Sequence, residues 1–142
     1  MTAPPAATAR LVVDTDVASF IFKWHPGFAP RYVAMVRGAL LVVSFMTVAE
    51  MRHGALEANW GQRKIDLLES YLGDFSVLDS DDRLCSAWAN IRHESARKGR
   101  RMSTADAWIA ASAITLGAPL VTNNPGDYRH LDRLQIVSAT EG

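Results

Sequence analysis

The stretch Leu11-Val12-Val13-Asp14-Thr15-Asp16 decides the fold class of this chain. Its three aliphatic residues in succession are typical of a short strand that is buried on both faces of a sheet. Residues 15–23 then place Val17, Phe20 and Ile21 on one face of a helix. A buried strand that leads directly into an amphipathic helix predicts a parallel sheet built from alternating strands and helices.

The same alternation continues along the rest of the chain. Further buried strands are predicted over residues 39–43, 75–78, 118–121 and 134–137. Further helices are predicted over residues 30–37, from 44 or 47 to about 58, and over residues 61–72, 80–99 and 103–116. The signals for helix ends are Ser44 or Thr47, Ser80 and Ser103 as N-caps and Gly117 after the last helix. We therefore expect an α/β fold with an open parallel sheet of about five strands and helices on both faces.

The composition describes one small neutral domain. The chain has 142 residues, which suits a single domain over residues 10–142 after a tail over residues 1–9 that carries no targeting signal. Because 15 Lys and Arg balance 15 Asp and Glu, any binding of nucleic acid must depend on local charge. Apolar runs are too short for a membrane span, and we expect a soluble cytoplasmic protein. The single cysteine, Cys85, is expected to be a small buried residue of a helix.

Four acidic residues stand where an open α/β sheet places its ligands, beyond the carboxyl ends of strands. They are Asp14, Glu50, Asp106 and Asp127. Each also has a local explanation, as a helix cap, as part of a capping box or as support for a Pro-Gly turn. Four like charges in one place, however, repel one another unless a cation neutralises them. Carboxylate oxygens without cysteine ligands favour Mg²⁺ or Mn²⁺ over zinc.

Four motifs carry a resemblance to a known family. They are Leu-Val-Val-Asp14-Thr-Asp16, Ser44-Phe-Met-Thr-Val-Ala-Glu50-Met-Arg-His-Gly54, Thr104-Ala-Asp106-Ala-Trp-Ile-Ala-Ala111 and Val-Thr122-Asn-Asn-Pro-Gly-Asp127-Tyr128. In this order they resemble the successive motifs of PIN-domain ribonucleases, and above all those of the VapC toxins of bacterial toxin–antitoxin pairs. The resemblance extends from about Leu11 to Val137, which is nearly the whole chain.

The resemblance implies a PIN fold and an endoribonuclease toxin that uses Mg²⁺, or Mn²⁺, to activate the water that cleaves RNA. It also implies a cognate VapB-like antitoxin as partner, and we expect a homodimer. The implied catalytic and metal-binding residues are Asp14, Glu50, Asp106 and Asp127, with Asp14 and Asp106 as direct ligands and Thr122 as a supporting hydroxyl.

Two positions depart from the family's pattern. The chain has Asp16 where the family often has Asn, and this change is expected to add an oxygen on the metal side. It has Asn123 where the family often has Arg or His, and this change is expected to remove a phosphate contact. Neither departure disturbs the four carboxylates.

Two further clusters have two interpretations each. The basic residues Arg97, Lys98, Arg100 and Arg101 lead into the Asp106 motif, so we expect them to contact RNA phosphates. The alternative is a solvated helix end favoured by the helix dipole. The aromatic residues Trp24, Phe28 and Tyr32 form either an exposed groove for an antitoxin helix or a dimer mate, or a part of the core.

Two other functions compete with the ribonuclease. Val-Val-Asp14-Thr-Asp16 also matches the opening of haloacid-dehalogenase-like phosphatases, in which Asp14 would be a covalent nucleophile assisted by a positioned lysine. Lys64 and Lys98 lie within helical patterns and not at strand ends, which counts against this enzyme. The third possibility is a non-catalytic PIN domain that binds RNA or an antitoxin, and the complete set of four carboxylates argues against it.

Overall fold

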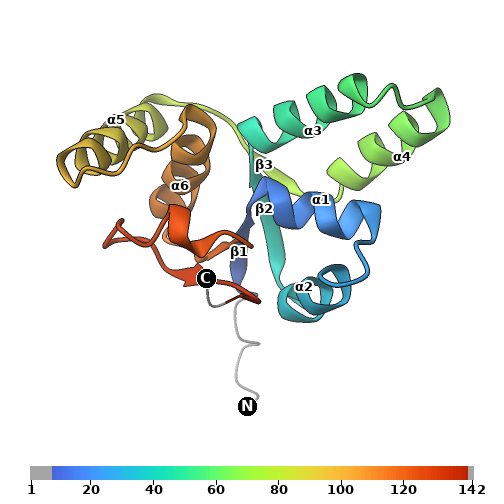
Figure 1. The fold of residues 1–142 in the computed structure, drawn as a ribbon, viewed down its shortest axis with the longest axis horizontal. Helices are drawn as coiled ribbons and strands as arrows, with labels where there is room; N and C mark the ends of the chain where they lie inside the picture. The colour runs from blue at the N-terminus through green and yellow to red at the C-terminus, as the bar shows by residue number, and fades with distance from the viewer. Residues whose placement is uncertain (1–7, 141–142) are drawn as a thin grey trace, which may run out of the picture.

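Five short parallel strands form the sheet that the sequence predicts. The computed structural model describes residues 8–140, and its strands are β1 (Arg10–Val13), β2 (Leu40–Ser44), β3 (Ser76–Leu78), β4 (Leu120–Val121) and β5 (Ile136–Val137). Their order across the sheet is β3-β2-β1-β4-β5, and every neighbouring pair is parallel. β1 therefore lies at the centre of the sheet (Figure 1). The α/β fold class is confirmed.

Helices cover both faces of this sheet. On one face lie α1 (Thr15–Lys23), α2 (Ala29–Val36), α3 (Phe45–Glu57) and α4 (Gln62–Leu72). On the other face lie α5 (Asp82–Arg97) and α6 (Thr104–Leu116), followed after β4 by the short 3-10 helix η1 (Pro125–Asp127) (Figure 1). Successive residues of β1 alternate between the two cores: Val12 packs with the α5–α6 side and Val13 with the α1–α4 side. Both residues are fully buried, which explains the continuous aliphatic run.

The helix ends follow the expected chemistry with one correction, at the start of α5. Ser103 caps α6 as predicted, and Gly117 ends it with φ of +64°, a left-handed conformation that favours glycine. Ser44, not Thr47, caps α3, and its hydroxyl accepts the N–H of Met46. The predicted cap Ser80 is wrong, because α5 begins one residue later and the carboxylate of Asp81 accepts the N–H of Leu84.

Three other expectations meet different outcomes. Residues 1–7 of the predicted tail lie outside the described residues, whereas the carbonyl of Ala9 already accepts a hydrogen bond from Leu40 N. Cys85 is exposed, contrary to the prediction, because α5 turns Leu84 and Ile91 toward the core and leaves the next position outside. Within residues 8–140 no helix has the length and apolar character needed to cross a membrane.

Candidate active site

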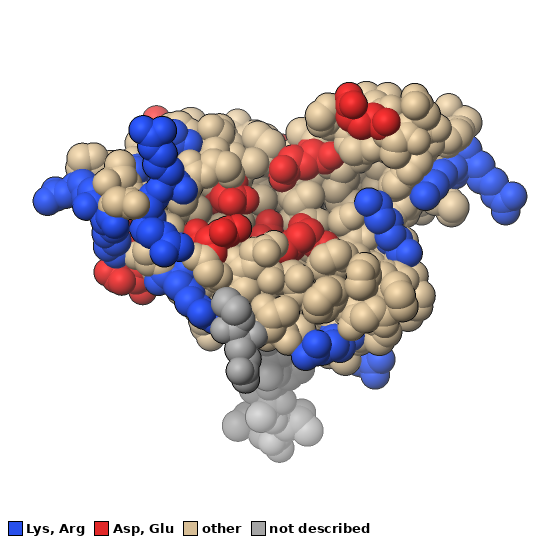
Figure 2. Space-filling model, in the orientation of Figure 1, with Lys and Arg blue, Asp and Glu red and all other residues tan. Residues whose placement is uncertain are grey.

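The predicted acidic residues gather at the carboxyl edge of the sheet. Asp14 directly follows β1, Asp106 lies in the first turn of α6, and Asp127 ends η1 after β4. Figure 2 shows acidic side chains in the hollow between the α5–α6 half and the α1–α4 half of the molecule. Segments that are about ninety residues apart in the chain therefore contribute to one acidic centre, because parallel strands end at the same edge.

Asp14 is the most buried member of this centre, with 6% of its surface exposed. One carboxylate oxygen accepts the N–H of Thr15 at 2.8 Å. The other accepts the hydroxyl of Thr122 at 2.7 Å and that of Tyr128 at 3.1 Å. Burial raises the pKa of Asp14 from 3.8 to about 7, and the charge of Asp16 adds to this increase, whereas the bond from Thr122 opposes it. The carboxylate is thus held by neutral donors in a place that disfavours its charge.

Asp106 approaches Asp14 from the first turn of α6. Its N–H donates to the hydroxyl of Ser103 at 3.0 Å, which fixes the first turn of α6. Its carboxylate accepts the Tyr128 hydroxyl at 3.3 Å, so one tyrosine contacts both aspartates. Burial raises the pKa of Asp106, and the neighbouring charge of Asp127 raises it further. Asp127 itself is exposed.

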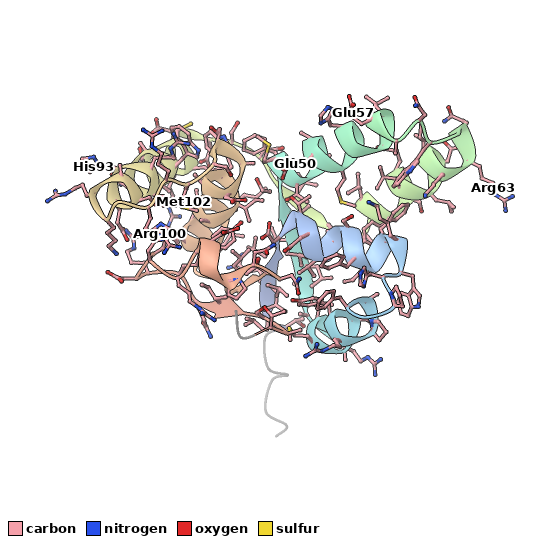
Figure 3. The ribbon with its side chains drawn as sticks, viewed as in Figure 1. Glu50, Glu57, Arg63, His93, Arg100 and Met102 are labelled. Atoms are coloured by element: carbon pink, nitrogen blue, oxygen red, sulfur yellow. The ribbon has the colours of Figure 1, made fainter. Side chains whose placement is uncertain are left out.

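The hydroxyl of Thr15 connects Glu50 to the segment that carries Asp14. The hydroxyl of Thr15 donates to the Glu50 carboxylate at 2.8 Å and lies 2.9 Å from the hydroxyl of Thr47. The predicted pairing of Glu50 with Thr47 in a capping box is therefore replaced by a contact to α1. Figure 3 shows Glu50 nearer the sheet than Glu57, which is the last residue of α3.

The two departures from the family pattern act on the loop after β4. The Asp16 carboxylate accepts the Asn123 N–H at 3.1 Å and the Asn124 side-chain amide at 2.7 Å. The Asn123 side chain turns away and accepts the Tyr32 hydroxyl at 2.6 Å. Asp16 therefore holds this loop against α1. Burial raises its pKa, and the charge of Asp106 adds to the increase.

The oxygen donors of the centre are of the kind that a hard divalent cation binds, but the carboxylates lie too far apart to hold one ion together. Burial and neighbouring carboxylates raise the pKa of Asp14 and of Asp106, so these groups form a set of like charges that a cation stabilises. Within residues 8–140, however, no three His, Cys, Asp or Glu side chains stand close enough to hold an ion in their present positions. The Tyr128 hydroxyl bridges Asp14 and Asp106 instead. Small movements of these side chains are needed before both aspartates can contact one ion.

Tyr128 and Thr15 are the site residues that the sequence analysis missed. Tyr128 is fully buried, and burial together with the charges of Asp14 and Asp106 raises the pKa of its hydroxyl. Tyr128 directly follows Asp127 in the last motif, and this position is the sequence signal that could have marked it as a site residue. Thr15 follows Asp14 in the first motif, and only the packing of α1 against α3 places its hydroxyl beside Glu50.

The basic run divides into bound and free residues. Lys98 contacts Glu94, Asp132 and the carbonyl of His130, which ties α5 to the loop after η1. Arg100 donates to the carbonyl of Gly126 at 2.7 Å and so supports the loop that carries Asp127. Arg97 and Arg101 are exposed. The structure therefore gives Lys98 and Arg100 packing contacts and leaves Arg97 and Arg101 as candidates for contact with a phosphate.

The lysine that a phosphatase needs is absent from the acidic centre. The three lysines of the chain are Lys23, Lys64 and Lys98. The first two lie over the Trp60 ring, at 6.0 and 4.1 Å from its centroid. Lys98 is held by Glu94 and Asp132. All three are thus engaged elsewhere, which counts against Asp14 as a phosphatase nucleophile.

The aromatic cluster around Pro26 is divided between core and surface. Tyr32 is fully buried, and its hydroxyl contacts the loop after β4. Trp24 is 57% exposed. Phe28 is partly buried and stacks on Phe20 with a centroid distance of 5.1 Å. Tyr32 therefore belongs to the core, whereas Trp24 remains available on the surface.

The parallel sheet and its acidic edge agree with the comparison to known families. A family model described as PIN domain matches residues 11–134. The chain belongs to the PIN domain family.

Individual relatives define the neighbourhood within this family. The chain is 27% identical to Ribonuclease VapC1 of Haemophilus influenzae over 125 residues, which cover 87% of this chain and 93% of the relative. It is also 27% identical to a tRNA(fMet)-specific endonuclease VapC of Shigella flexneri over 126 residues, 89% of this chain and 95% of the relative.

Solved structures agree with these relatives. The DNA-bound VapBC structure from Salmonella typhimurium has a TM-score of 0.81 at 25% identity and covers 92% of this chain and 98% of that one. VapBC-1 from nontypeable Haemophilus influenzae has a TM-score of 0.77 at 26% identity, with 91% and 97% covered.

Proposed function

We propose that this protein is a VapC-type endoribonuclease toxin that depends on Mg²⁺ or Mn²⁺ and acts in the cytoplasm. The observation that carries the proposal is the pair Asp14, at the end of the central strand β1, and Asp106, in the first turn of α6, whose carboxylates both contact the Tyr128 hydroxyl. Their pKa values are raised by burial and by neighbouring carboxylates. A divalent cation relieves this repulsion. The names of the relatives, which are ribonucleases and endonucleases, support RNA as the substrate.

The residues of the acidic centre have different proposed roles. Asp14 and Asp106 hold the ion, and Thr122 keeps the Asp14 carboxylate in one orientation through its 2.7 Å hydrogen bond. Glu50, fixed by Thr15, and the exposed Asp127 orient the attacking water or complete a second ion position. When bound, the divalent ion lowers the pKa of water and stabilises charge on the phosphate. Attack by water on the phosphodiester leaves a 5′-phosphate and a 3′-hydroxyl.

A VapB-like antitoxin is the proposed partner, because the solved relatives include VapBC structures. An open groove between α1 and α4 suits one of its helices. Ile21, Phe22, Leu67 and Tyr71 supply the apolar lining, and Lys23, Arg63 and Lys64 supply basic groups around it. Leu67 is 58% exposed, which leaves an apolar contact for a partner. Figure 3 places Arg63 at the tip of α4, far from the acidic centre.

The proposal is tested by incubating the purified protein with total RNA in Mg²⁺, in Mn²⁺ and in EDTA. We expect new RNA fragments with 5′-phosphate ends in either metal and none in EDTA. Ligation that requires a 5′-phosphate, followed by sequencing, identifies both the ends and the cleaved positions. Fragments that form equally in EDTA, or that carry 5′-hydroxyl ends, contradict the metal-dependent hydrolysis. Release of phosphate from a small phosphomonoester with a phosphorylated Asp14 supports the phosphatase instead.

A further inference from the structure

A polar cavity lies beside the acidic centre, between α5 and the start of α6. It has a volume of about 530 Å³ and is lined by Arg92, Ala96, Arg101, Met102, Ser103 and Thr104. Ser103 connects it to the acidic centre, because its hydroxyl accepts the N–H of Asp106. Met102 and Arg100 mark this segment in Figure 3. The cavity therefore lies within one helical turn of a proposed metal ligand.

Arg92 is held in place at this cavity by neutral groups. Its guanidinium donates to the carbonyl of Met102 at 3.0 Å and approaches the Thr104 hydroxyl at 3.4 Å. It also lies over the Trp88 ring, 5.3 Å from the centroid. Trp88 stacks on Trp108 at 5.1 Å, and its indole N–H donates to the carbonyl of Thr104. The aromatic stack thus orders the guanidinium without neutralising its charge.

Within residues 8–140, neither arginine of the cavity forms an ion pair with an acidic side chain. Elsewhere on the surface Arg52 pairs with Glu69, and Lys98 pairs with Glu94 and Asp132. Neither Arg92 nor Arg101 belongs to such a pair, and no carboxylate lines the cavity. Figure 2 shows basic side chains gathered on the α5 side of the acidic residues. In a chain with no net charge, this cavity is a local site of uncompensated positive charge.

We infer that this cavity binds a phosphate of the RNA strand next to the phosphate that is cleaved, an inference that rests on the proposed ribonuclease function. Arg92 is the ordered contact, because its planar guanidinium is already oriented by Trp88 and the Met102 carbonyl. Arg101, which is exposed, adds a second positive charge, and Thr104 lines the same cavity. Trp88 is a positioning residue that acts through Arg92.

The neighbouring acidic centre explains why such a site is needed. Unneutralised carboxylates repel an incoming RNA backbone, and an adjacent pair of arginines offsets this repulsion. The position beside Asp106 directs the strand, so the cavity fixes which phosphodiester reaches the carboxylates. Arg97, which faces a separate surface with His93 and Lys98, has no comparable place beside the centre. Of the four basic residues predicted to contact RNA phosphates, this assignment keeps Arg101 at the cavity, and it places Arg92 beside it.

The test measures binding of a labelled single-stranded RNA of random sequence to the full chain in Ca²⁺ over a series of salt concentrations. We expect Arg92→Gln and Arg101→Gln each to weaken binding, by roughly tenfold for Arg92. Each is expected to lower the salt slope by about 0.7 for the lost phosphate contact. Arg92→Lys is expected to keep the slope but lose affinity, because lysine lacks the planar fork.

Arg83→Gln is the matched control, since Arg83 lies on the same helix but lines a different cavity with Ile114 and Arg133. Equal affinity and slope in the Arg92, Arg101 and Arg83 variants would overturn the inference. The inference would also be overturned if Arg92→Gln converted a dimer to a monomer and left RNA binding unchanged. That result would make the cavity a contact between two copies of the chain. Asp106→Asn separates the two proposals: it removes cleavage under the proposed function, whereas RNA binding in Ca²⁺ tests the cavity alone.

Discussion

The acidic centre and the arginine cavity are neighbours with opposite charge, yet in both of them neutral groups hold the charged side chain in place. In the acidic centre, hydroxyl and amide donors from Thr122, Tyr128 and Thr15 hold a carboxylate. In the cavity, carbonyl and aromatic groups of Met102 and Trp88 hold a guanidinium. Neutral partners fix the geometry of a charged group and leave its charge available to a ligand. On the surface, in contrast, Arg52 and Glu69 neutralise each other's charge in an ion pair.

The largest effect is expected from breaking the acidic centre. Asp14→Asn or Asp106→Asn keeps the size of the side chain but removes a metal-binding oxygen charge, and should reduce RNA cleavage by roughly 10³-fold or more. Cleavage under single-turnover conditions in Mg²⁺ measures the loss, with Asp79→Asn as a surface control outside the centre. Full activity in Asp106→Asn contradicts the assignment of the acidic residues.

The next effect concerns stability and pH. Because the folded-state pKa of Asp14 is raised from 3.8 to about 7, the folded protein binds more protons than the unfolded chain between these values. The free energy of unfolding without metal should therefore fall as pH rises from about 4 to 7, by about 2–4 kcal/mol, and level off above. Asp16 and Asp106 act in the same direction, since their pKa values are also raised.

Urea unfolding in EDTA at several pH values measures this dependence. Asp14→Asn is expected to flatten most of it and to leave the protein as stable as the wild type or more stable at pH 8, because the like-charge repulsion is gone. A wild-type stability that rises over this pH range contradicts the buried, repelling carboxylates.

A smaller effect is expected from removing the hydroxyl that Asp14 and Asp106 share. Tyr128→Phe should lower the free energy of unfolding by about 1–3 kcal/mol at pH 8, and by less at pH 5, where Asp14 is protonated. Tyr71→Phe is the matched control, since the Tyr71 hydroxyl donates to the neutral carbonyl of Ala18 at 2.8 Å. The loss in the control should not depend on pH in this range. If the loss of unfolding free energy depends on pH equally in both variants, the bond from Tyr128 to the aspartates has no special role.

The smallest effect is expected at the exposed edge of the centre. Asp127 interacts with Asp106, but its exposure allows water and salt to screen its charge. Asp127→Asn should reduce cleavage by only roughly tenfold, because screened charges contribute less than buried ones. The same single-turnover assay checks this order. A loss equal to that of Asp14→Asn places Asp127 among the direct ligands.

The sequence predicts most of the fold and the acidic residues, because both depend on local patterns. Aliphatic runs such as residues 11–13 mark buried strands, and an acidic residue after a strand reaches the ligand-binding edge whatever the details of packing. The roles of Tyr128 and Arg92 depend on contacts with distant residues, which no local pattern specifies. Tyr128 contacts Asp14 across 114 positions, and Arg92 becomes a wall of the cavity only where α5 folds back on α6.

The same limit explains why the surroundings of Lys98, Arg100 and Cys85 differ from what the sequence suggests. Lys98 and Arg100 look like free charges in a basic run, but the loop after β4 returns to meet them and supplies carbonyl and carboxylate acceptors. Cys85 and Leu84 are adjacent apolar residues, and the rotation of α5 against the sheet decides which one is buried.

Calorimetric titration of the metal-free protein with Mn²⁺ near pH 7 tests the central claim most directly, namely that the acidic centre is a cation site. In buffers of different ionisation enthalpy we expect binding accompanied by proton release, because Asp14 with a pKa of about 7 is partly protonated before the ion arrives. Asp14→Asn and Asp106→Asn should abolish both the binding and the proton release, whereas Arg92→Gln should preserve them. Mn²⁺ binding that persists in both aspartate variants, or none in the wild type, would contradict the account.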